Sequence, residues 1–167
     1  FNATPFVRTY NEGVVLAYSP RTESIVYNPA HEKFRELFNN YTITHELGHR
    51  IDHMLKITSN SDEFAVSIEK ARIIMGTKKD MFIAYSRGED KEGFISDIFD
   101  ALDMAKDGSK FKTGHTKEYW SKLGSDRREI FANIFTLKCI RSEGHLKFLR
   151  ENFPEIMEFF DSITWEV

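Results

Sequence analysis

Among its 167 residues the chain has a single cysteine and no apolar run of the roughly 20 residues that a membrane-spanning helix needs. One cysteine cannot form an internal disulfide, so nothing in the sequence requires an oxidising compartment. Cys139 lies in an apolar run, which predicts a small buried core residue. We therefore expect no disulfide framework and no membrane partner.

The chain also lacks a concentration of charge of one sign. Its 23 basic and 26 acidic residues are interspersed and give a formal net charge of -3. Without a basic stripe, nucleic-acid binding is not expected. A content of 41% hydrophobic and 14% aromatic residues predicts one globular domain over residues 1–167, with no linker or internal repeat. Because the chain begins at Phe1 rather than at a methionine, we expect a fragment of a longer protein.

Hydrophobic periodicity predicts an α+β fold that is mostly helical, with a small N-terminal sheet or hairpin. Two β-rich runs, 14–18 and 24–27, are separated by a turn at Pro20. Residues 76–91 are mostly polar and are predicted to form an exposed loop around a short apolar segment, 81–85. Helices are expected near 31–38, 62–75, 91–106 and 116–123, after residue 128, and over 146–160 with a break at Pro154.

The sequence HELGH at residues 45–49 is the strongest chemical signal in the chain. On a helix, His45 and His49 lie one turn apart on nearly the same side, close enough to bind one metal ion. Glu46 lies about 100° around the helix, beside the ion, where a carboxylate can act as general base. This spacing is typical of zinc-dependent hydrolysis of peptide bonds. The alternative is a solvated helix face with two ordinary histidines.

Gly48 interrupts this helix with a residue that costs up to about 1 kcal/mol of helix propensity relative to alanine. We therefore expect another strand or backbone to approach the helix closely at Gly48.

A zinc site of this type needs a third ligand. His53 lies about 12 Å along the helix from His45, too far to share the ion. The extended motif with a third histidine would require histidine at position 55, where the chain has leucine. The best remaining candidate is Glu129, which begins a mostly apolar helix downstream. The alternative is that Asp126 caps that helix and Glu129 only closes a capping box.

These motifs resemble the zincin metallopeptidases that use a glutamate ligand, including the catalytic domain of anthrax lethal factor. The resemblance is closer to the metallopeptidase domains attached to phage minor head proteins. It rests on HELGHRID at 45–52, ISDIFDAL at 95–102, GHTKEYW at 114–120 and EIFA at 129–132. It implies an endopeptidase with Zn²⁺ as cofactor, bound by His45, His49 and Glu129, with Glu46 as general base. It also implies phage capsid or portal partners, and a location in the host cytoplasm or on the virion.

Three further residues are candidates for supporting roles. Asp52 lies three residues after His49 on the same face, where a carboxylate can accept the second N–H of a ligating imidazole; the alternative is a solvent-facing acid. His115 and Tyr119 are four residues apart, and either could donate to the oxyanion of the tetrahedral intermediate. The alternatives are a loop histidine and a core tyrosine.

Two other functions are compatible with the motif. One is a structural or assembly module of a virion that binds a metal without turnover. The other is a secreted, toxin-type protease. The same ligands also suit Mn²⁺, Co²⁺ or Ni²⁺.

Overall fold

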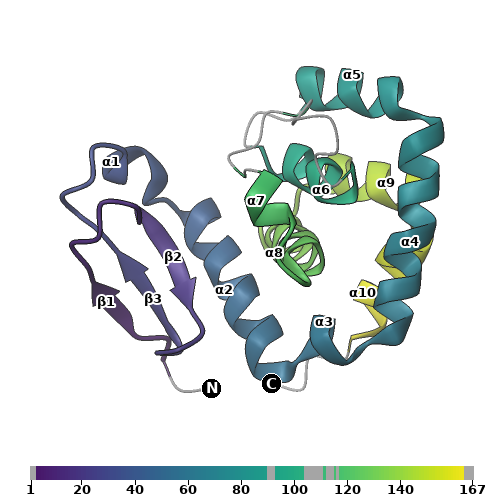
Figure 1. Cartoon of the computed structure of the whole chain (residues 1–167). Helices are drawn as coiled ribbons and strands as arrows, with labels where there is room; N and C mark the ends of the chain where they lie inside the picture. The colour runs from purple at the N-terminus through teal and green to yellow at the C-terminus, as the bar shows by residue number, and fades with distance from the viewer. Residues whose placement is uncertain (1–2, 90–92, 104–110, 112–114, 116, 164–167) are drawn as a thin grey trace.

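The computed structural model describes residues 3–89, 93–103, 111, 115 and 117–163. It has the predicted α+β class, with many helices and one small sheet (Figure 1). The strands are β1 (Phe6–Arg8), β2 (Leu16–Ser19) and β3 (Ser24–Tyr27). The helices are α1 (Phe34–Leu37), α2 (Asn40–Leu55), α3 (Ile57–Asn60), α4 (Asp62–Thr77), α5 (Lys79–Glu89), α6 (Phe94–Asp103), α7 (Lys117–Trp120), α8 (Ser125–Cys139), α9 (Glu143–Asn152) and α10 (Pro154–Ser162).

The sheet has the strand order β1-β3-β2, with β2 antiparallel and β1 parallel to β3. The predicted hairpin of β2 and β3 is confirmed, whereas β1 was not anticipated. Strand β2 is an edge strand and lies beside α2 (Figure 1). Tyr18 is paired with Ile25, whose N–H donates to Pro5 on the β1 side. The N–H of Tyr18 therefore points out of the sheet, toward α2.

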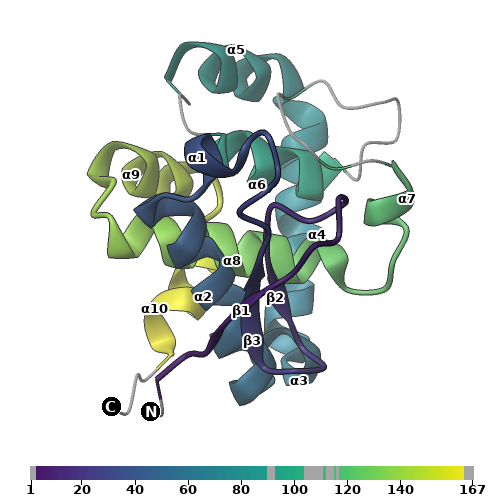
Figure 2. The ribbon, with the colours of Figure 1, turned by 90° about the vertical axis from the view of Figure 1, so that its left-hand side faces the viewer.

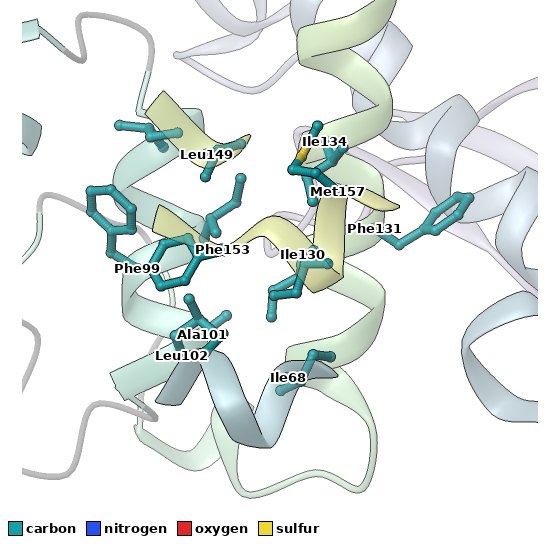
Figure 3. Close-up of a cluster of buried hydrophobic side chains, with 14 of the residues drawn as sticks. Ile68, Phe99, Ala101, Leu102, Ile130, Phe131, Ile134, Leu149, Phe153 and Met157 are labelled. Carbon is teal, nitrogen blue, oxygen red and sulfur yellow. The ribbon is translucent and has the colours of Figure 1, made fainter. Parts of the chain in front are cut away.

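Helix α8 lies at the centre of the helices, with α2 on one side and α6 on another (Figure 1). In Figure 2 the sheet lies in front of α2, and α8 crosses behind it. Figure 3 shows Ile130 and Ile134 of α8 near Phe153 and Met157 of the C-terminal segment. All four side chains are buried. The core thus fixes α8 from the face opposite α2.

Two predictions from the sequence were wrong. Residues 79–89 form helix α5 rather than an exposed loop, because Phe82 is fully buried against Phe99 and Phe153. Tertiary packing of one aromatic outweighed the polar composition around it. Cys139 is exposed, not buried, and it is the last residue of α8.

The remaining helix predictions agree with the structure to within a few residues. The break at Pro154 is confirmed, since α9 ends at Asn152 and Pro154 opens α10. Parts of the helices expected at 91–106 and 116–123 lie outside the described residues. None of the helices among the described residues is long and apolar enough to cross a membrane.

Candidate metal centre

Helix α2 presents the two motif histidines to a cleft. The helix begins after Asn39, whose side chain accepts a hydrogen bond from the N–H of Thr42, and it ends at Leu55. His45 and His49 lie one turn apart, with their Nε2 atoms separated by 3.0 Å. Their side chains are 14% and 15% exposed, so both are accessible from the cleft without being surface groups.

Glu129, in the second turn of α8, points at both histidines. Its Oε2 lies 3.2 Å from His45 Nε2, and its Oε1 lies 3.4 Å from His49 Nε2. The capping-box alternative does not hold, because Gly124 is the N-cap of α8 and Asp126 pairs with Arg72. Residues 80 or more positions apart in the sequence thus converge, as predicted.

A close approach of α2 and α8 brings these residues together. A Cβ atom on Gly48 would lie 2.9 Å from the Cα of Ala132 and 3.2 Å from its Cβ and carbonyl oxygen. The helices therefore touch backbone to backbone, one helical turn after Glu129 and between the two histidines. The expected close approach at Gly48 is confirmed.

The donor atoms fit one metal ion. Four-coordinate ligands about 2.0–2.2 Å from zinc are separated by roughly 3.3–3.6 Å, close to the 3.0–3.4 Å between these atoms. Glu129 Oε2 is buried and accepts no hydrogen bond from the described residues, despite the nearby imidazole. His45, His49 and Glu129 therefore lie close enough to bind one metal ion.

Without a metal, the cluster behaves as an ion pair. Burial opposes ionisation of Glu129, but the neighbouring His49, His115 and His45 hold the pKa of its carboxyl well below the usual range. Burial would lower the pKa of His45, but its contact with Glu129 raises that pKa to about 9. A metal ion must therefore displace a proton from this cluster.

Glu46 is mostly buried beside the histidines, and its position is set by the sheet. Its Oε2 accepts a 2.6 Å hydrogen bond from the N–H of Tyr18, the group that points out of edge strand β2. This bond joins the motif helix to the sheet. Sequence reasoning missed it, because a backbone donor leaves no signal in the side-chain pattern.

The cleft in front of these residues has a volume of about 760 Å³. Edge strand β2 forms one wall with Leu16 and Tyr18, and α3 contributes Thr58. This volume is within the range of ligand-binding clefts. His45, Glu46, His49, His115, Tyr119 and Glu129 all line it.

Asp52 also lines the cleft, although it is 3% exposed. Its two oxygens accept 2.7 Å hydrogen bonds from the N–H and hydroxyl of Thr58, which tie the end of α2 to α3. Burial raises the pKa of Asp52, and these two bonds oppose the rise. The solvent-facing alternative is thus wrong, while the predicted role in orienting His49 stays a prediction. His53 contacts the Tyr18 hydroxyl, 2.9 Å from its Nδ1.

His115 and Tyr119 both reach Glu129. Their rings stack with centroids 4.0 Å apart. The Tyr119 hydroxyl donates a hydrogen bond to Glu129 Oε1, and His115 Nε2 lies 3.7 Å from Glu129 Oε2. Burial, followed by the charge of Glu129, raises the pKa of Tyr119, so its hydroxyl stays protonated and able to donate.

Asp97, in α6, belongs to the same cluster and was missed by sequence reasoning. Its Oδ1 lies 3.9 Å from His115 Nε2, and its Oδ2 accepts a 2.7 Å hydrogen bond from Asn133. The available signal was an acidic residue inside the strongly apolar helix ISDIFDAL. An acid buried in such a helix needs a partner, which the apolar pattern alone does not identify.

Comparisons of this chain with protein-family models, with curated proteins and with solved structures find no match. The assignment of a function therefore rests on the residues and on the geometry of the cleft.

Proposed function

We propose that this chain is a zinc-dependent endopeptidase of the zincin type with a glutamate ligand. The observation that carries the proposal is the convergence of His45, His49 and Glu129 beside Glu46 in one cleft. Two imidazoles and a carboxylate are the ligand set of zinc hydrolases that keep one coordination position open.

When bound to these residues, zinc would supply the positive charge that polarises a carbonyl and acidifies water. Glu46 accepts the proton from the attacking water as the water oxygen bonds to the carbonyl carbon. It then gives this proton to the leaving amine nitrogen as the C–N bond breaks, so the products are a carboxylate and an amine. The Tyr18 amide holds one oxygen of Glu46, and the Glu46 side chain lines the cleft.

Tyr119 is the better candidate to donate to the developing oxyanion. Its hydroxyl is protonated, lines the cleft and already reaches a proposed metal ligand. His115 Nε2, in contrast, is directed between two carboxylates.

An extended substrate would add to the sheet at β2. The outer edge of this strand faces the cleft. Successive residues of a strand direct their backbone N–H and C=O groups to opposite sides, so those of Ala17 are directed toward β3 and those of Leu16 outward. Main-chain pairing at such an edge gives affinity with little sequence preference.

Charge at the cleft favours acidic substrate side chains. Lys56, Lys122 and Arg128 line it, and among the described residues none of the three forms an ion pair with a carboxylate. We propose that they attract peptides with aspartate or glutamate near the scissile bond.

The decisive experiment pairs Glu46→Gln with Glu129→Ala. Glu46→Gln should retain zinc and lose about 10²- to 10⁴-fold in kcat on a broad peptide library, because only proton transfer is removed. Glu129→Ala should lose both zinc and activity. Metal analysis after dialysis separates the two variants. Wild-type peptidase activity in Glu46→Gln would disprove the assignment of the base.

The same experiment tests one alternative function, the virion module. A virion module that binds metal without turnover would bind zinc in wild type yet cleave nothing. The association with phage head proteins and the secreted, toxin-type protease both stay predictions from the sequence. Cleavage of capsid or portal proteins, but not of unrelated proteins, would favour the association with phage head proteins.

A further inference from the structure

A second group of three potential metal ligands meets at Glu129, on the side away from His49. Glu129 Oε2 lies 3.7 Å and Asp97 Oδ1 3.9 Å from the same nitrogen, His115 Nε2. All three donor atoms lie within 4.8 Å of one another. They come from α6, from the segment before α7 and from α8, so only the folded chain brings them together.

These distances do not fit hydrogen bonds between the three side chains. N–H···O bonds have donor–acceptor distances of about 2.7–3.2 Å, shorter than both. Two tetrahedral ligands that each lie about 2.0–2.2 Å from one ion are separated by roughly 3.3–3.6 Å, and the 3.7 Å and 3.9 Å observed here lie closer to that range than to a hydrogen bond. We propose that Asp97, His115 and Glu129 form a second divalent-cation site, which shares Glu129 with the site at His45 and His49.

Two largely buried carboxylates, Glu129 and Asp97, each direct an oxygen toward the proposed cation site. The side chain of Glu129 is 2% exposed, and its Oε2 accepts no hydrogen bond from the described residues. Asp97 is 13% exposed; Asn133 holds its Oδ2, which leaves Oδ1 directed at His115. A cation bound beside these two neighbouring carboxylates would balance their negative charges.

In this arrangement Glu129 would contribute to both cation sites, and a pair of ions could stabilise both the attacking and the leaving group of a hydrolysis. His115 is then a ligand, and Tyr119 alone remains as the oxyanion donor. One imidazole and two carboxylates suit Zn²⁺ or Mn²⁺. The inference rests on the metal ion proposed at His45, His49 and Glu129, but not on peptide hydrolysis.

The test is zinc stoichiometry. Chelator-treated protein is dialysed against buffered Zn²⁺, and metal per chain is measured by mass spectrometry. Wild type should saturate at two equivalents, and Asp97→Asn and His115→Gln at one. Asp103→Asn is the matched control, because it makes the same change in the same helix, at a residue that pairs with Lys79; it should keep two.

Saturation of wild type at one equivalent would overturn the inference. So would two equivalents retained in His115→Gln, since the second ion would then lie elsewhere; this variant decides the question if Asp97→Asn does not fold. Failure of the proposed function is distinguishable: two zinc ions without cleavage reject the peptidase only. Cleavage with one zinc ion rejects only the second site, and no bound zinc rejects both.

Discussion

Replacing Gly48 with alanine tests the packing that assembles the site. The new Cβ would lie 2.9 Å from Ala132 Cα, whereas carbon atoms in contact are normally about 3.5–4.0 Å apart. Helices α2 and α8 must therefore separate by roughly 0.6–1 Å. Overpacking of this kind costs about 1–3 kcal/mol, against up to about 1 kcal/mol gained in helix propensity. We expect a net loss of about 0–2 kcal/mol and a Tm lower by up to roughly 8 °C.

The same separation moves Glu129 away from the histidines of α2. Zinc affinity should fall about 10- to 100-fold, the range seen when the groups supporting metal ligands are mutated. Urea unfolding and competition with a chromophoric chelator measure the two effects. Affinity should fall in the folded protein, under conditions where circular dichroism shows helix content equal to wild type.

Gly76→Ala is the matched control for this variant. Gly76 lies in helix α4, and a Cβ added there would meet nothing within 4 Å. This change should raise stability by up to about 1 kcal/mol and leave zinc affinity unchanged. If Gly48→Ala were as stable as Gly76→Ala and bound zinc like wild type, the argument that a close helix contact sets the ligand geometry would be refuted.

Three further predictions concern the cleft. Tyr119→Phe should lower kcat by about 10²- to 10³-fold without weakening zinc binding, because we expect zinc to replace the Tyr119 hydroxyl at Glu129 and leave it free to donate to the oxyanion; weaker zinc binding would show that the hydroxyl supports the ligands instead. In metal-free protein, the raised pKa of His45 contributes stability that is complete below pH 6.5 and lost as the pH rises through about 9. Urea unfolding with chelator present should show this decline, and a His45→Gln variant that shows the same decline would contradict it. Lys122→Glu should lower kcat/KM for acidic peptides relative to basic ones, and an unchanged ratio in paired-substrate assays would remove Lys122 from substrate selection.

The local parts of the site could be predicted from the sequence because a helix fixes the spacing of its own side chains. His45, Glu46 and His49 follow from one helical turn. The close approach at Gly48 follows from a residue that a helix tolerates only at some cost. Glu129 was chosen by elimination among the remaining donors, and the structure places it close enough to His45 and His49 for the three to bind one metal ion.

The parts that could not be predicted depend on tertiary contacts. The amide of Tyr18 reaches Glu46 only because β2 is an edge strand with that residue in the outward-facing register. Asp97 was hidden in an apolar helix, whose pattern indicates burial but not which neighbour the buried acid meets. Helix α5 was missed because Phe82 finds its partners in α6 and in the C-terminal segment, far from the polar residues around it.

Helix α8 explains why the site depends on a core that lies outside the cleft. Its apolar face is buried against the C-terminal segment, and its opposite face supplies Glu129 and contacts Gly48 through Ala132. A change in the core that shifts α8 along its axis would move Glu129 relative to His45 and His49 without altering any residue of the cleft. The geometry of the cluster should therefore respond to conservative changes at the core residues Ile130 or Ile134 more than to changes at exposed residues equally far away in sequence.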